Sequence, residues 1–212
     1  MKIGIIGSGA VATTLATGFI KHGHDVMLGT REAAKLEGFA KSNPKARIGS
    51  FAETAKFGEM IVLSVNGSAA EEALELAGTA NLAGKTVIDT TNPIADAPPE
   101  QGILKFFTDL NHSLMEKLQA KVPAAHFVKA FNSVGNAAMV NPKFEGGKPS
   151  MFIAGNNEAA KNTVVAILDQ FGWDVEDLGS AVGARAIEPL CILWCAPGFL
   201  RNDWNHAYKV LR

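Results

Sequence analysis

The sequence is short of cysteine, of tyrosine and of net charge, and each shortage argues against a class of function. Its 212 residues contain two cysteines and one tyrosine. Cys191 and Cys195 stand four positions apart in an apolar segment, a spacing that favours packing in a helical core over a disulfide or a metal site. Twenty basic residues balance 21 acidic ones, which argues against a surface that binds nucleic acid. We therefore expect a protein without a metal site that binds no nucleic acid.

Signals for export and for membrane insertion are also missing. The first residues, MKIGIIG, run directly into a strand pattern and lack the charged start, long apolar stretch and cleavage site of a signal peptide. No apolar run reaches the roughly 18 residues that a membrane-spanning helix needs. We expect a cytoplasmic chain with no membrane partner.

Short apolar runs alternate with helical patterns over the first two-thirds of the chain, as is typical of a parallel sheet with crossover helices. The predicted strands are residues 2–6, 26–28, 47–49, 60–65, 86–89, 127–131, 150–154 and 173–177. The predicted helices are residues 10–21, 31–42, 51–56, 68–77, 111–121 and 158–171. The tail, residues 182–211, is predicted to be largely helical with a break at Ala196-Pro197-Gly198.

These patterns predict an α/β protein with a Rossmann fold, whose doubly wound sheet is mostly parallel. The length suits one main domain with a short addition. We expect a Rossmann domain over residues 1–180 and a C-terminal helical segment, residues 181–212, packed on it.

The strongest motif lies between the first strand and the first helix and reads Gly7-Ser8-Gly9-Ala10-Val11-Ala12. In this G-x-G-x-x-A pattern Gly7 permits a tight turn and Gly9 lets the backbone approach a pyrophosphate, while Ala12 lets the helix pack closely on the strand. The N-terminus of the helix then offers free N–H groups and the positive end of its dipole to the phosphates. The motif predicts a dinucleotide site.

The end of the second strand indicates which dinucleotide binds. NAD enzymes usually carry an acidic residue there to bind the ribose 2′-hydroxyl, but this chain reads Leu28-Gly29-Thr30-Arg31. Arg31 can pair with a 2′-phosphate and stack on adenine, Thr30 can donate to the same phosphate, and Lys35 can add a third contact. The sequence therefore predicts NADP(H).

Polar residues follow three successive strands at the edge where ligands bind in open parallel sheets. They are Ser64-Val65-Asn66, Thr90-Thr91-Asn92-Pro93 and Asn132-Ser133-Val134-Gly135. No obvious acid or base accompanies them: the orientation of Lys129 within its strand is open, His126 stands at the wrong strand end, and a Ser-Tyr-x-x-x-Lys set is missing. We predict no catalytic side chain and direct hydride transfer, which suits a flavin-like acceptor.

Taken together, the GSGAVA turn, Gly29-Thr30-Arg31, Ser64-Val65-Asn66 and Val128-Lys129-Ala130-Phe131-Asn132 resemble the deazaflavin (F420-type) dependent NADP oxidoreductases. They are also similar to the cytosolic reductase domain of the six-transmembrane metalloreductases. The resemblance implies hydride transfer to a deazaflavin without an obligatory protein acid. It also implies a homodimer formed through C-terminal helices, for which residues 187–199 are apolar enough.

The resemblance and the motifs together give the predicted site. The cofactor-binding residues are Gly7, Ser8, Gly9, Ala10, Val11, Thr30, Arg31, Lys35, Val65, Asn66, Asn92, Pro93, Ala130 and Asn132. The residues expected to bind the second substrate are Asn132, Ser133 and Val134. Asn66 and Asn132 stand where the deazaflavin enzymes have a proline and a histidine, so a flavin or another quinoid acceptor stays open.

Two other functions also stay open. A hydroxyacid or imine reductase is one, although the segment from Gly179 to Leu190 carries Arg185 and Glu188 and lacks the lysine that hydroxyacid dehydrogenases place there. The other is a non-catalytic sensor that binds NADP(H) and reports its redox state to a partner.

Overall fold

An eight-stranded sheet runs through the computed structural model, which describes all 212 residues. The strands are β1 (Lys2–Ile6), β2 (Asp25–Gly29), β3 (Arg47–Gly49), β4 (Met60–Leu63), β5 (Thr86–Asp89), β6 (His126–Lys129), β7 (Ser150–Gly155) and β8 (Asp174–Asp177). Their order is β3-β2-β1-β4-β5-β6-β7-β8, and every neighbouring pair is parallel except β6 and β7. The predicted doubly wound, mostly parallel Rossmann sheet is confirmed.

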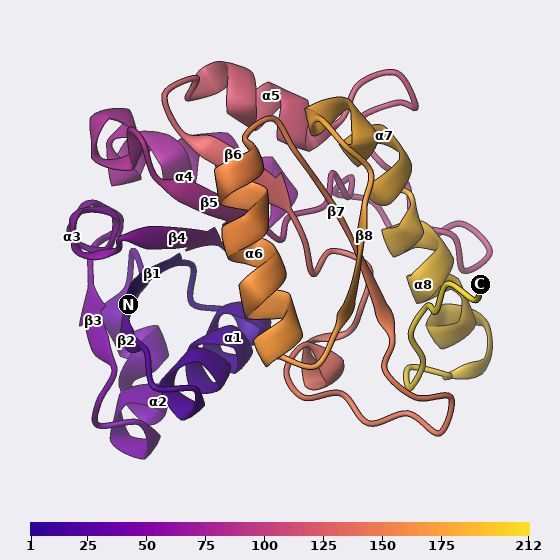
Figure 1. The fold of residues 1–212 in the computed structure, drawn as a ribbon, viewed down its shortest axis with the longest axis horizontal. Coiled ribbons are helices and arrows are strands. Elements are labelled where there is room, and N and C mark those ends of the chain that lie inside the picture. Colours follow the sequence, from indigo (N-terminus) through magenta and orange to yellow (C-terminus); the bar gives the residue numbers. More distant parts are fainter.

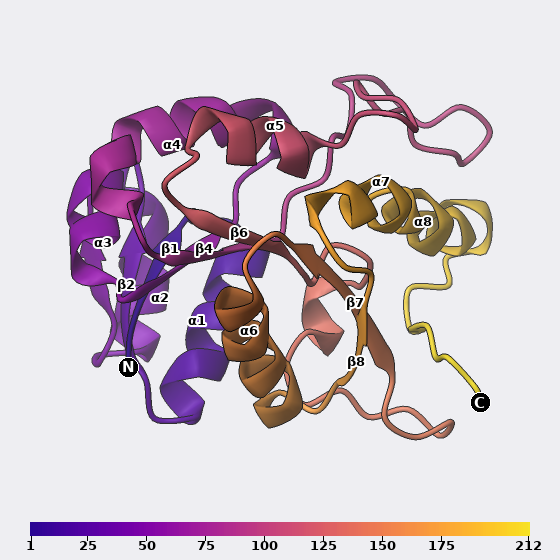
Figure 2. The ribbon, with the colours of Figure 1, turned by 45° about the horizontal axis from the view of Figure 1, so that its top comes forward.

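Helices cover both faces of the sheet. They are α1 (Ala10–Lys21), α2 (Glu37–Ser42), α3 (Phe51–Phe57), α4 (Ala70–Ala77), α5 (Leu114–Lys121), α6 (Glu158–Gln170), α7 (Ala184–Ile187) and α8 (Leu190–Arg201). Figure 1 shows α6 crossing in front of the sheet, and Figure 2 shows α3, α4 and α5 on one face with α1 and α6 on the other. The central strand β4 is buried along its whole length because it lies between these two layers.

The register of the central strands places the site. Ile6 pairs with Leu63, Leu63 with Asp89, and Asp89 with Lys129, so the residues that follow these positions emerge along one edge of the sheet. Ile6 also pairs with Gly29 at the end of β2. The strand order reverses between β1 and β4, and ligands of open α/β sheets bind at such a switch point.

Two predicted helices begin later than their patterns indicated, because side chains bind the backbone before them. The predicted helix 111–121 begins at Leu114, where Ser113 and Glu116 form a capping box. The predicted helix 31–42 is replaced by a turn, a 3₁₀ segment (Ala33–Leu36) and α2. In the turn the Thr30 hydroxyl accepts from the N–H of Glu32 and donates to its carbonyl, which leaves Arg31 outside any helix.

The prediction for the tail was wrong in two respects. Helix α8 runs through Pro197 to Arg201 and has no break at Ala196-Pro197-Gly198, and the residues after it are not helical. A Cβ on Gly198 would lie 2.3 Å from the indole of Trp204, so this glycine permits a close approach and does not end the helix. Asn202, with φ of 57°, ends it, and the tail then returns along β7, where Ser150 N–H donates to the Tyr208 carbonyl.

None of the helices combines the length and the apolar character needed to cross a membrane. No group of three or more histidine, cysteine or acidic side chains is arranged to hold a metal ion.

Candidate cofactor-binding site

A cavity of about 750 Å³ lies at the carboxyl edge of the parallel strands. The residues after β1, β2, β4 and β5 form it, together with the starts of α1 and α4. The predicted residues that line it are Gly7, Ser8, Gly9, Ala10, Val11, Thr30, Arg31, Lys35, Val65, Asn66 and Asn92. Pro93, Ala130, Asn132, Ser133 and Val134 are predicted site residues that do not line it.

The glycine-rich turn has the geometry that a pyrophosphate needs. Gly7 has φ of +142°, and a Cβ there would lie 2.0 Å from the Ser64 carbonyl oxygen, so no other residue fits. A Cβ on Gly9 would meet nothing within 4 Å, which leaves its backbone open to the cavity. No side chain caps the N-terminus of α1, so its first N–H groups are free to bind phosphate oxygens. The turn therefore fits the phosphates of a dinucleotide.

Two cations stand beside this turn, and each is paired with a carboxylate. Arg31 Nη1 lies 3.5 Å from Glu72 Oε2, and Lys35 Nζ lies 3.0 Å from Glu32 Oε1. The four side chains are more than half exposed, so a dianionic 2′-phosphate can replace the carboxylates at small cost. Glu72, from α4, was missed by the sequence reasoning, since no local pattern places α4 opposite the end of β2.

The polar residues after β5 and β6 bind one another. Asn92 Nδ2 donates to the Asn132 carbonyl over 2.8 Å, and Asn132 Nδ2 donates to Asn92 Oδ1 and to the Ile187 carbonyl. Asn92 borders the cavity, while Asn132 is buried behind it. The two amides thus join the ends of β5 and β6 to α7, and they hold one wall of the cavity in place.

The chain turns sharply after β6, which places Ala130, Ser133 and Val134 in the interior. Phe131, predicted as the last residue of the strand, has φ of 63°, a conformation that a bulky side chain adopts only under constraint. Its ring is buried, with its centroid 6.1 Å from that of Phe171. Packing of this ring in the core compensates for the strained backbone.

Beneath this wall lies a fully buried ion cluster of Lys129, Asp89 and Glu188. Lys129 Nζ lies 2.7 Å from Asp89 Oδ2 and 2.9 Å from Glu188 Oε1, and it donates to the Thr91 carbonyl over 2.8 Å. Burial acts to lower the pKa of Lys129, but attraction to the two carboxylates outweighs it and raises that pKa. The partners were missed by sequence reasoning; a lysine in an apolar strand was the available signal, because a buried cation needs a buried anion.

The lining of the cavity offers few groups for proton transfer. Its titratable side chains are Arg31, Lys35, Glu32 and Glu72 near the end of β2, and Asp96 in the loop after β5. Histidine, tyrosine and cysteine are all missing from the lining. Arg185 and Glu188 also stay away from it, since Arg185 pairs with Glu116 and Glu188 with Lys129. The arrangement suits a reaction that moves a hydride and requires little acid–base help.

With this geometry in view, comparisons with known proteins identify relatives. The sequence model of the family described as NADP oxidoreductase, coenzyme F420-dependent, matches residues 2–93. A protein of Arthrobacter sp. FB24 proposed to be an F420-dependent NADP reductase has a crystal structure that is 32% identical, with a TM-score of 0.93 and full coverage of both chains.

Two further similar proteins are longer, and this chain covers only a part of each. Metalloreductase STEAP3 of Rattus norvegicus is 31% identical over 218 residues, which include all of this chain but 42% of that protein. The chain thus spans less than half the length of this curated relative. A reductive aminase of Aspergillus terreus, solved in complex with NADPH, is 19% identical, with a TM-score of 0.66, over 91% of this chain and 60% of that one. This last similarity concerns the fold alone.

Proposed function

The chain belongs to the coenzyme F420-dependent NADP oxidoreductases, and from this premise we propose that it transfers a hydride between NADP(H) and a deazaflavin or flavin. It is an NADP-dependent oxidoreductase with a Rossmann fold. Our proposal concerns the identity of the small-molecule acceptor, a deazaflavin or a flavin. The observation that supports it best is a dinucleotide-sized cavity without a histidine or tyrosine in its lining.

We assign the cofactor to the cavity in the orientation that its charges favour. Arg31 and Lys35 bind the 2′-phosphate, and the backbone of Gly7 to Val11 binds the pyrophosphate. The other end, formed by Thr90, Thr91 and Asn92, then receives the nicotinamide. There these three residues would position the ring, from which NADPH would supply a hydride when bound.

On the acceptor side we keep the sequence prediction that Asn132, Ser133 and Val134 border the second substrate. All three are less than a tenth exposed and do not line the cavity, so an acceptor in the cavity would lie next to Asn92, which is hydrogen-bonded to Asn132. A ring that stabilises its own negative charge, as a flavin or deazaflavin does, needs no proton from the protein during hydride transfer. Asp96 is the one titratable group that the cavity offers beyond β5.

The test is a rapid-mixing experiment on the purified chain loaded with NADPH. We expect a loss of nicotinamide absorbance on mixing with a deazaflavin or FMN, and a rate in Asp96→Asn within about twofold of the parent, because no proton is required. Absence of oxidation by both acceptors, together with reduction of a cyclic imine that Asp96→Asn abolishes, would replace this function with that of an imine reductase.

We also propose that the chain forms a homodimer through α8. Leu193 and Leu200, seven positions apart on this helix, are 59% and 61% exposed. Residues at this spacing lie on one side of a helix, and large exposed apolar side chains gathered in this way commonly mark an interface. Figure 1 shows α8 at the outer edge of the molecule, where a second copy has room to pack.

A further inference from the structure

We propose that the buried cluster of Lys129, Asp89 and Glu188 tunes the cavity toward the oxidised cofactor. In this view its excess negative charge makes NADP⁺ bind more tightly, relative to NADPH, than the cavity alone would allow. The inference rests on the proposed function in one respect, namely that the nicotinamide occupies the end of the cavity formed by Thr90, Thr91 and Asn92.

The cluster is built into the wall of that end. Asp89 Oδ1 accepts hydrogen bonds from the backbone N–H of Thr91 over 2.9 Å and from its hydroxyl over 2.7 Å. Lys129 Nζ donates to the carbonyl of the same threonine. Thr91 therefore has its N–H, its carbonyl and its hydroxyl all bound by the cluster, and it lines the cavity.

The cluster carries more negative than positive charge. Asp89 Oδ1 accepts from Thr91 and Asp89 Oδ2 lies beside the Lys129 ammonium; Glu188 accepts from the N–H groups of Leu114 and Met115 and also lies beside Lys129, surroundings that suit carboxylates. Two carboxylates against one ammonium leave one negative charge. The N-terminus of α5, which supplies those two N–H groups, offsets about half of it.

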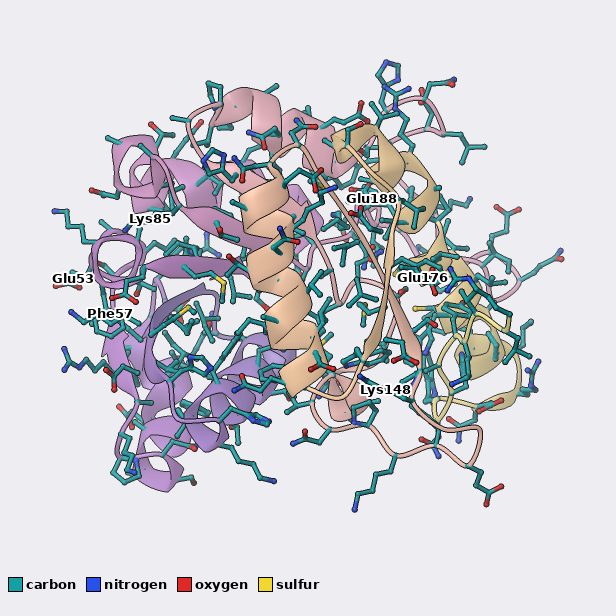
Figure 3. All side chains as sticks on the ribbon, in the orientation of Figure 1. Glu53, Phe57, Lys85, Lys148, Glu176 and Glu188 are labelled. Atoms are coloured by element: carbon teal, nitrogen blue, oxygen red, sulfur yellow. The ribbon has the colours of Figure 1, made fainter.

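No neighbouring cation neutralises the rest of this negative charge. Cys191, next in the helix that follows Glu188, is uncharged, because a hydrogen bond with Cys195 and burial raise the pKa of its thiol. Arg185 is neutralised by Glu116. Figure 3 labels Glu188 in the interior near α7, and its exposed fraction is 2%, while those of Lys129 and Asp89 are 0%. Water and salt therefore screen this charge weakly.

A fixed negative charge discriminates between the two forms of the cofactor. The nicotinamide ring is positive in NADP⁺ and neutral in NADPH, so the cluster attracts the first and not the second. Tighter binding of NADP⁺ lowers the reduction potential of the bound couple, which makes bound NADPH the better hydride donor. On the protein, this favours hydride transfer from bound NADPH to the acceptor, while the overall equilibrium between the free species is unchanged.

A series of charge variants tests this inference through binding, independently of turnover. The dissociation constants of NADP⁺ and NADPH are measured by calorimetric titration for each protein. Glu188→Gln takes the cluster to zero charge and is expected to raise the ratio of the NADP⁺ constant to the NADPH constant on the order of fivefold.

Two controls separate charge from structural damage. The double variant Lys129→Met/Glu188→Leu removes the ion pair but keeps one negative charge, so its ratio should match the parent. Glu158→Gln removes a carboxylate that is 79% exposed and should leave the ratio unchanged. If Glu188→Gln does not fold, Asp89→Asn makes the same change of charge and carries the same expectation.

The outcomes are distinct. A ratio that follows the charge series supports the inference, and a ratio that is equal in all folded variants, or that shifts alike in Glu188→Gln and in the double variant, overturns it. A parent protein that binds neither NADP⁺ nor NADPH overturns the proposed function itself.

Discussion

Arg31 pairs with Glu72, the carboxylate that a 2′-phosphate would displace in the proposed orientation of the cofactor. Glu72 Oε2 lies 3.5 Å from its guanidinium, and both side chains are about 60% exposed. An exposed pair of this kind contributes little stability, so opening it costs little, whereas a phosphate in its place forms stronger, charge-assisted hydrogen bonds. In the proposed orientation of the cofactor, Glu72 would hold Arg31 in place before binding and would repel the phosphate that replaces it.

Opposite effects are therefore expected from the two partners. Arg31→Ala should weaken NADPH binding by about 1–3 kcal/mol, the range for a lost charge-assisted contact. Glu72→Gln should strengthen it a few-fold, because a repulsive charge is removed and Arg31 is released. Fluorescence titration with NADPH and with NADH checks both variants, and NADH affinity should change little. Equal NADPH affinity in Arg31→Ala and in the parent would exclude Arg31 from the 2′-phosphate site.

At the scale of elements, the start of α5 is hydrogen-bonded both to α7 and to the buried ion cluster behind the cavity. Glu116 caps this helix with Ser113 and receives both Nε and Nη2 of Arg185 from α7. The adjacent N–H groups of Leu114 and Met115 bind Glu188 of the buried cluster. Hydrogen bonds from Arg185, together with those from Ser113, lower the pKa of Glu116 to about 2, although burial opposes them.

This low pKa predicts a defined dependence of stability on pH. Because the pKa of Glu116 is lower in the folded state than in the unfolded chain, the pair stabilises the fold fully above about pH 4.5, and this contribution is lost as the pH falls toward about 2. Glu116→Gln should unfold at lower urea concentration than the parent at pH 6. The difference should shrink between pH 4.5 and pH 2; a constant difference would contradict the assigned pKa.

The sequence predicts the elements whose requirements are local. The turn from Gly7 to Ala12 depends on residues within one short segment, and β4 appears as a continuous β-branched and apolar run because it is buried on both faces. The capping pair of Ser113 and Glu116 is also a local feature, but the sequence analysis did not use it and started the helix too early. NADP(H) was predicted from Thr30, Arg31 and Lys35 and from the missing acidic residue after the second strand, and the family supports NADP(H) as the cofactor.

Features set by tertiary contacts were not accessible in this way. Pro197 and Gly198 are residues that usually interrupt a helix, but here Trp204 packs on Gly198 and α8 continues to Arg201. Lys129 could not be oriented because its partners, Asp89 and Glu188, come from other parts of the chain. The division into residues 1–180 and 181–212 stays a prediction, and the last eleven residues of the second part belong to no helix or strand.

Across the whole molecule, exposed apolar side chains are concentrated toward the C-terminal end. Phe199 and Trp204 are 46% and 42% exposed near Leu193 and Leu200, whereas no large apolar side chain of α1 or α6 is exposed. Figure 2 shows α7 and α8 end to end below the long loop that precedes α5, and a Cβ on Gly102 of that loop would lie 2.8 Å from Leu200. The loop therefore covers part of α8 and leaves Leu193 free for another partner.

A charge placed at Leu193 should separate the two copies of the proposed dimer. One chain has a mass of 22.4 kDa, and we expect light scattering to give twice this mass for the parent. Leu193→Arg should have the mass of a single chain, because an unpaired cation in an apolar interface costs several kcal/mol. Leu110→Arg, at a leucine that is 74% exposed in the loop before α5, should stay dimeric. A monomeric parent would show that α8 serves another purpose. If both variants remain dimeric, the two copies associate through a different surface. The exposure of Leu193 and Leu200 on α8 would then need another explanation, such as contact with a different partner.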